Sequence, residues 1–336
     1  MANDESPAAS RTAGGFLLAV LLFFLAPLVG EYLLGNLPVT WLWLLIVLAP
    51  LYGGGALLIR ETARRLELGW PGIMLLGLAY AVIEEALVTQ SLFNPNYVGQ
   101  RLLDFGYMPA LGMGSWWTVF VLSIHAIWSI STPIALAEAI SGKRRHSPWL
   151  GKLGLAFVAA LFVIACVVTG RQQSESFRAS VSQLTISGLA VLLFVALAFV
   201  VGRKSRGVEG RVVARGVPRP ILTAVRAFLL GSAFMLLAIA HTLMPSIVNV
   251  VAMLALIAIG CLLLWRWARA SAWSPEHELA VAAGFLATYA WYGFVQVPSV
   301  GQIPPLADAA GNLFFALGAV ALIRIAYRRV TRPGSQ

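Results

Sequence analysis

The chain has 336 residues, of which 59% are hydrophobic and only 11% are charged. Soluble globular domains carry about a quarter charged residues, so this composition excludes an ordinary soluble domain and indicates a multi-pass membrane protein. The formal net charge is +10, but the basic residues are scattered between apolar blocks, and we expect no binding to nucleic acid.

The apolar residues fall into about ten blocks, each near the twenty residues that a helix needs to cross the hydrocarbon core. In chain order the predicted spans are 14–34, 39–58, 70–93, 116–140, 153–169, 180–202, 221–241, 247–267, 279–297 and 309–327. We therefore expect an all-α fold, a polytopic membrane helix bundle of about ten transmembrane helices. It should form a single integral membrane domain over residues 1–336, with a polar leader at 1–13 and a flexible tail at 328–336.

The positions of Lys and Arg predict the orientation. Of the 24 Lys and Arg residues, all except Arg101, Arg171 and Arg178 lie on one predicted side of the membrane. They are in the leader, in the tail, or in and next to every second connection between spans. Under the positive-inside rule both termini are then cytoplasmic. We expect a multi-pass protein of the cell membrane, whose basic segments contact membrane lipid.

Two adjacent carboxylates, Glu84 and Glu85, lie inside the third predicted span. A charge near the middle of the bilayer costs at least ~2.5–3.5 kcal/mol, so such residues indicate a functional site. Counted at 1.5 Å per residue from the outer span ends at Phe93 and Trp116, Glu85 and His125 are both about 12–13 Å deep. The pair and the imidazole are therefore predicted to meet in the outer-leaflet half of the membrane.

Other polar residues could complete this site. Thr89 is one helical turn from Glu85, and Ser129 is one turn from His125. His241 ends the seventh span and Asn249 begins the eighth, near the same face of the membrane. The candidate catalytic residues are Glu84, Glu85, His125 and His241, with Thr89, Ser129 and Asn249 as auxiliary polar groups.

The segments "VIEEALVTQ" and "FVLSIHAIWSISTPIALAEA" resemble the glutamate-type intramembrane peptidases. This superfamily includes the CPBP family, also called Abi or CAAX-protease-like, and the PrsW-like proteases. By this resemblance Glu84 and Glu85 match the paired glutamates, His125 the first histidine and His241 the second. The chain departs from the pattern because no Arg or Lys closely follows the pair and Pro245 stands four residues after His241.

The resemblance implies a divergent intramembrane endopeptidase in which one glutamate activates water and His125 orients the water or protonates the leaving amine. Its substrate would be a membrane protein or peptide, cleaved at a bond in or near a membrane segment. No cofactor and no metal is implied. The chain also lacks HExxH, CxxC, Walker A and GxSxG sequences, although carboxylates and imidazoles are suitable metal ligands.

Two other interpretations remain open. Ten spans suit a proton-coupled secondary transporter of two five-span halves, with Pro50 and the glycines at 53–55 forming a helix break in the second span. In that case Glu84, Glu85 and His125 would relay protons. A non-catalytic membrane relative that acts in immunity or assembly is the third interpretation.

Overall fold

The computed structural model describes residues 7–205, 217–300 and 303–332. Almost all of them are helical. The longer helices are α1 (Pro7–Pro27), α2 (Leu44–Arg65), α3 (Gly69–Val82), α4 (Ser115–Ile124), α5 (Thr132–Ser141), α6 (Lys152–Ser174), α7 (Val181–Ser205), α8 (Pro220–Ile239), α9 (Ser246–Ala268), α10 (Pro275–Tyr292) and α11 (Pro305–Val330).

Several shorter elements extend or join these helices. Three π-helical segments are η1 (Leu28–Leu33), η3 (Ile83–Val88) and η4 (His125–Ser131). The 3-10 turns are η2 (Val39–Trp41), η5 (Gly142–Arg144) and η6 (His241–Leu243), and the strands are β1 (Tyr107–Met108) and β2 (Met113–Gly114).

The prediction of a polytopic helical membrane protein is confirmed. Within the described residues, 9 helical stretches are long and apolar enough to cross a membrane, and α4, η4 and α5 together form one of them, Ser115–Arg144. The remaining predicted span corresponds to α10, which is 18 residues long and has Glu276 and Glu278 in its first turn. The first turn of α10 is therefore polar, yet the helix packs against α5, α8 and α11 inside the bundle.

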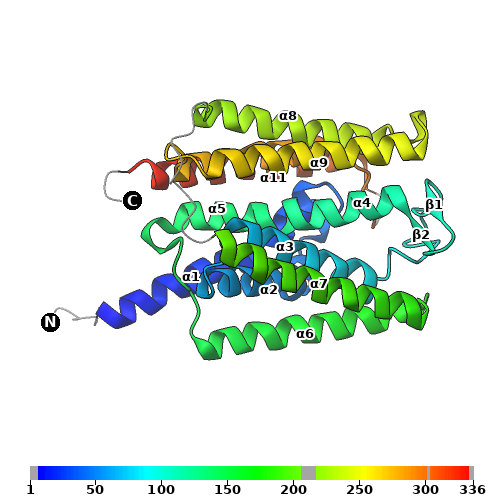
Figure 1. The fold of residues 1–336 in the computed structure, drawn as a ribbon, viewed down its shortest axis with the longest axis horizontal. Coiled ribbons are helices and arrows are strands. Elements are labelled where there is room, and N and C mark those ends of the chain that lie inside the picture. The colour runs from blue at the N-terminus through cyan, green and yellow to red at the C-terminus, as the bar shows by residue number, and fades with distance from the viewer. Residues whose placement is uncertain (1–6, 206–216, 301–302, 333–336) are drawn as a thin grey trace.

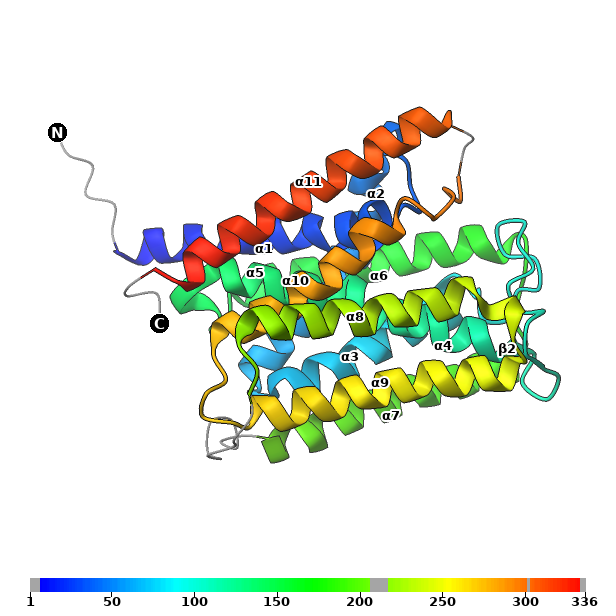
Figure 2. The same cartoon turned by 90° about the horizontal axis from the view of Figure 1, so that it is seen from above.

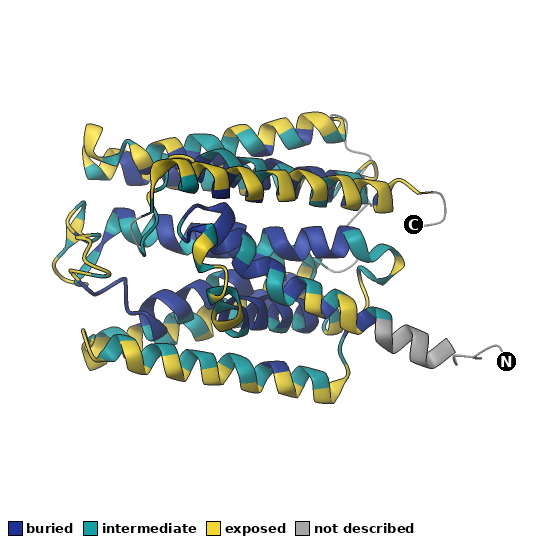
Figure 3. Ribbon diagram, turned by 180° about the vertical axis from the view of Figure 1, so that it is seen from behind, coloured by how far each residue is buried: buried dark blue, intermediate teal, exposed yellow. Residues whose placement is uncertain are grey.

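The helices are arranged in three layers (Figure 1), with α6 and α7 on one side, α1 to α5 in the middle, and α8, α9 and α11 on the other side. Buried residues concentrate in the middle layer, whereas the outer helices carry most of the exposed residues (Figure 3). Many exposed residues of these outer helices are large and apolar, such as Leu153, Val181 and Leu262. Such side chains suit contact with lipid tails rather than water.

The second span is one continuous helix, so the helix break predicted for the transporter interpretation is wrong. Helix α2 runs through Pro50 and through Gly53, Gly54 and Gly55, and all three glycines are buried. A Cβ atom at Gly53 would overlap the carbonyl oxygen of Phe23 in α1. The glycines therefore allow close helix packing and do not unwind the chain.

The start of α1 and the end of α11 lie at the same end of the bundle, opposite the β1–β2 hairpin (Figure 1). Both ends differ slightly from the predicted leader and tail, because α1 already begins at Pro7 and α11 continues to Val330. Residues 1–6 of the leader and 333–336 of the tail lie outside the described part of the chain.

Candidate functional site

Two π-helical segments carry the acidic pair and the histidine. Segment η3 continues α3 and contains Glu84 and Glu85, while η4 continues α4 and begins at His125. A π-helical turn is uncommon and is found frequently at functional sites, because its extra residue changes the direction in which side chains point. Helix α3 packs directly along η4, so the two segments are neighbours.

The imidazole of His125 lies between the two carboxylates. Its Nδ1 atom is 3.1 Å from Oε2 of Glu84, and its Nε2 atom is 2.8 Å from Oε1 of Glu85. The exposed fraction is 2% for Glu84, 5% for Glu85 and 6% for His125, so the cluster is shielded from its surroundings. An acid–base pairing at this distance offsets part of the cost of burying ionisable groups in a membrane.

Hydroxyl groups hold Glu85 in place. Ser91 donates a hydrogen bond from its hydroxyl to Oε2 of Glu85, and the Trp117 indole donates in turn to Oγ of Ser91 at 3.2 Å. The Thr89 hydroxyl donates to the backbone carbonyl of Glu84 at 2.9 Å and lies 3.4 Å from Oε2 of Glu85. Thr89 thus lies beside the pair, as its spacing predicts, and Ser91 is an additional contact in the segment that follows η3.

Three buried polar atoms around His125 have no well-aligned hydrogen-bond partner among the described residues. They are Oε2 of Glu84, Nδ1 of His125 and the hydroxyl of Tyr80. Tyr80 lies on α3, with its ring centroid 6.4 Å from that of His125. Buried polar groups in folded proteins are nearly always satisfied by protein or ordered water, so this side of the cluster has unused capacity to bind a water molecule or a ligand.

Glu31 is a fourth buried ionisable residue near this cluster. It lies in the π-helical segment η1 and accepts hydrogen bonds from the hydroxyl of Tyr52 and, at 2.6 Å, from Nδ2 of Asn36. The Tyr52 ring lies 5.8 Å, centroid to centroid, from the ring of His125. In the sequence Glu31 lies near the outer end of the first predicted span, 14–34, and this position on the same side of the membrane as Glu84 and His125 is a signal that could have linked them.

Ser129 lies where η1 and η4 meet. It is buried in η4, and a Cβ atom at Gly30 would come within 2.9 Å of its hydroxyl oxygen. Gly30 therefore allows the Glu31 segment to approach the His125 segment closely. Ser129 contributes to this contact between segments, and the structure does not place it against the carboxylates.

His241 is separate from the buried cluster. Its ring stacks on the indole of Trp116 with centroids 4.1 Å apart, and its Nδ1 lies 2.8 Å from the carbonyl oxygen of Ala238. Trp116 precedes His125 by nine residues, or about 13 Å along a helix. Among the described residues, the ionisable group whose atoms approach within 4.8 Å contains Glu84, Glu85 and His125 and does not include His241.

Asn249 links two outer helices. Its side chain is buried, and Nδ2 donates a hydrogen bond to the carbonyl of Leu237 in α8 at 2.9 Å. This bond connects α9 to α8, which is a common use of amides between membrane helices. The position of Asn249 near the same face of the membrane as the cluster does not bring it to His125, because that position leaves open which helices are neighbours.

The residues that could hold a metal ion are Glu84, Glu85 and His125, whose candidate ligand atoms lie within 4.8 Å of one another. Carboxylate and imidazole ligands are typical of zinc, iron and manganese sites. The two imidazole nitrogens, however, face different carboxylates. One ion bound to a single nitrogen of His125 would reach both glutamates only after the carboxylates moved.

The apolar spans and the buried acid–base cluster define a polytopic membrane protein with a candidate active site in its middle layer. A family model described as "Uncharacterized membrane protein family" matches residues 20–328, and the chain belongs to this family. Comparisons with curated proteins and with solved structures find no match. The family match supports a membrane protein and leaves its activity to be inferred from the site.

Proposed function

We propose that the protein is a metal-independent hydrolase of the glutamate type that cleaves peptide bonds in or near membrane segments. The observation that carries this proposal is the position of the His125 imidazole between the Glu84 and Glu85 carboxylates. The peptide bond as the target rests on the sequence resemblance to glutamate-type intramembrane peptidases. The cluster itself supports acid–base chemistry on water.

The contacts suggest different roles for the two glutamates. Glu85 is held by Ser91 and faces Nε2 of His125, so it is suited to orient the imidazole. Oε2 of Glu84 faces Nδ1 of His125 at 3.1 Å and accepts no well-aligned hydrogen bond among the described residues, so it is suited to accept a proton from water. Glu84 is therefore the proposed general base.

In the proposed reaction Glu84 takes a proton from a water molecule while the water oxygen bonds to the carbonyl carbon. The carbonyl electron pair moves onto its oxygen and forms an oxyanion. Collapse of this intermediate breaks the C–N bond, and protonated His125 gives its proton to the leaving nitrogen. Proton transfer by a positioned side chain typically contributes about 10²–10⁴-fold to a rate.

Tyr80 is the proposed donor to the oxyanion, in place of His241 or Asn249. Its hydroxyl is buried beside His125 and has no aligned hydrogen-bond partner among the described residues. A donor that is already in position and shielded from water stabilises developing negative charge strongly. His241 and Asn249 make other contacts, to Trp116 and Leu237.

Substrate access requires movement, because all three residues of the cluster are buried. Segment η3 is covered by α6 and α7, which both pack against it. Few residues of these two helices are buried, as is also the case for α11. In the proposal a membrane-embedded substrate reaches Glu84 past α6 and α7.

Comparison of membrane-protein fragments tests the activity in cells. Cells would carry the wild type, Glu84→Gln, His125→Ala or the matched control Glu175→Gln, whose carboxylate is exposed near the end of α6. We expect fragments in the wild type and the control that are absent from both site variants at equal expression. Identical fragment patterns in all four would argue against proteolysis and for a non-catalytic role in immunity or assembly.

The transporter interpretation predicts uptake or release of a solute that depends on Glu84 and His125 without any fragments. Its structural basis was a break in the second span, and α2 is continuous there. The contact of His125 with Glu84 and Glu85 would suit a proton relay as well, but the sequence resemblance to glutamate-type peptidases favours hydrolysis. The hydrolase is therefore the function that we propose.

A further inference from the structure

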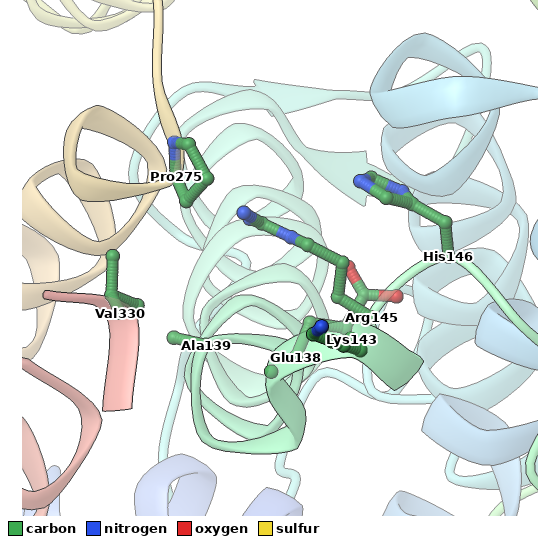
Figure 4. Close-up of a pocket in the computed structure, with 8 residues that line it drawn as sticks. Glu138, Ala139, Lys143, Arg145, His146, Pro275 and Val330 are labelled. Carbon is green, nitrogen blue, oxygen red and sulfur yellow. The ribbon is translucent and has the colours of Figure 1, made fainter. Parts of the chain in front are cut away.

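A second polar site lies at the end of the bundle that carries the chain ends. It is a cavity of about 310 Å³ between the end of α5, the start of α10 and the end of α11. Figure 4 shows Arg145 and His146 extending from the segment after α5, with Pro275 and Val330 on neighbouring elements. The lining residues are Glu138, Ala139, Gly142, Lys143, Arg145, His146, Pro275 and Val330.

The carboxylates at this cavity are already neutralised by arginines. Glu138 is fully buried and accepts hydrogen bonds from Arg60 at 3.1 Å and from Arg64 at 2.6 and 2.7 Å. Glu278 in the first turn of α10 pairs with Arg145 at 2.5 Å. Neither carboxylate is available to neutralise the remaining cations.

Lys143 and Arg145 retain positive charge and hydrogen-bond donors that these carboxylates do not use. Lys143 is exposed at the cavity and forms no ion pair among the residues that the structure describes. The Nε atom of Arg145 is buried and has no hydrogen-bond partner in the same part of the chain. Both groups are donors suited to a phosphate oxygen.

The state of His146 supports a positive potential in the cavity. Burial, followed by the positive charges of Arg64 and Arg145, lowers the pKa of His146 to about 4. The imidazole is therefore neutral at pH 7. The positive charges of Arg64 and Arg145 that disfavour its protonation would attract a bound anion.

The cavity lies at the ends of apolar stretches, where helices would meet lipid headgroups. It is formed where the apolar stretch Ser115–Arg144 ends and where α11 ends at Val330. Basic pockets between membrane helices on the cytoplasmic side commonly bind anionic headgroups. We propose that this cavity binds a phosphate group, through Lys143 and Arg145, on an anionic ligand at the predicted cytoplasmic face.

Phospholipid headgroups and free phosphate both present phosphate oxygens to Lys143 and Arg145. A titration with each kind of ligand shows which of them the cavity binds. Purified full-length protein in detergent would be titrated with dioleoylphosphatidylglycerol, dioleoylphosphatidylcholine or inorganic phosphate, and binding read by native mass spectrometry. We expect saturable binding of phosphatidylglycerol or of phosphate, and weaker binding of the zwitterionic lipid. Preference for the lipid or for inorganic phosphate identifies the source of the ligand.

Variants decide whether the cavity is responsible. Lys143→Gln should raise the Kd about fivefold, the effect of removing one basic residue near an anionic headgroup, whereas Lys143→Arg should leave it nearly unchanged. The matched control is Lys152→Gln, an exposed lysine at the start of α6 that does not line the cavity. A gain-of-charge variant, His146→Lys, should lower the Kd about fivefold.

Several outcomes would overturn the proposal. They are equal Kd values for Lys143→Gln and Lys152→Gln, an unchanged Kd for His146→Lys, equal binding of the two lipids, or no binding of any probe. The site variants of the hydrolase leave this binding unaffected, so failure of one proposal is distinguishable from failure of the other.

Discussion

The Nε2 atom of His125 lies 2.8 Å from Oε1 of Glu85, although the two residues are separated by the whole β1–β2 loop region. Each belongs to a π-helical segment: η3 ends one apolar span, and η4 lies within another. The contact therefore depends on two local departures from α-helical geometry at the same place. Such departures are maintained where surrounding packing holds them, and they concentrate at functional sites.

Replacing Tyr80 with Phe tests the proposed oxyanion donor. The Tyr80 hydroxyl is buried beside the Glu84 carboxylate and has no well-aligned hydrogen-bond partner within the described residues, so Tyr80→Phe removes this one donor and keeps the ring. We expect cleavage to slow about 10²-fold or more, as for loss of one oxyanion donor, with unchanged stability. The matched control is Tyr289→Phe, which removes another buried unpartnered hydroxyl, on a ring stacked against Trp128. Equal cleavage rates in Tyr80→Phe and the wild type would remove Tyr80 from the mechanism.

Close packing of α1 against α2 makes Gly53 intolerant of a side chain. A Cβ atom at this position meets the backbone of Phe23, which cannot move aside as a side chain would. We expect Gly53→Ala to lower the free energy of unfolding by about 1–3 kcal/mol. The control is Gly260→Ala in α9, where no described atom lies within 4 Å of the added carbon. Denaturation in mixed micelles would measure both, and equal stabilities of the two variants would contradict the packing argument.

The buried ion pairs at the basic end should be sensitive to loss of one partner. Glu138→Gln leaves the guanidinium groups of Arg60 and Arg64 without their shared carboxylate, so we expect a loss of about 3–5 kcal/mol in the free energy of unfolding. Asp104→Asn is the matched control, because its pair with Arg101 is exposed, at 53% and 70% of the two side chains. The control should change stability by less than ~1 kcal/mol. A similar loss in the free energy of unfolding for Glu138→Gln and Asp104→Asn would show that burial of the ion pair does not determine the loss.

His146 should make stability depend on pH in a defined range. The residue is exposed overall, but partial burial of the imidazole and then Arg64 and Arg145 lower its pKa from 6.5 to about 4. Between these values the unfolded chain binds a proton that the folded protein does not, so the free energy of unfolding falls as the pH drops from 6.5 toward 4. His146→Gln lacks this group and should lose less stability between pH 7 and pH 4.5. An equal loss in wild type and variant, measured by denaturation at both pH values, would contradict the lowered pKa.

The spans and the central cluster could be predicted from the sequence because both follow from the cost of burying polar groups in a bilayer. Ionisable side chains inside a bilayer need a partner, and few partners are available there. The similar depth of Glu84, Glu85 and His125 on consecutive spans made them one another's expected partners. His241 ends its span near the same face of the membrane, but a position along the span does not determine which helices touch or how each is rotated. The structure places it on Trp116 instead.

The burial of Glu31 could not be predicted from the sequence. It lies near a span end, where a charged residue is ordinarily solvated by the membrane interface. Its burial depends on η1 packing against η4 through Gly30, a contact between segments far apart in the chain. The π-helical turns themselves were not predicted, because no residue preference of this chain distinguishes them from the α-helices that they interrupt.

The most direct test of the central claim follows the oxygen of water into product. Purified protein would be reconstituted with total membrane proteins of the expression host in H₂¹⁸O, with and without a metal chelator, and new C-termini analysed by mass spectrometry. We expect ¹⁸O-labelled new C-termini with the wild type and with Glu175→Gln, unaffected by the chelator, and none above background with Glu84→Gln or His125→Ala. Labelled termini at the wild-type level in Glu84→Gln, or their absence from the wild type, would contradict it.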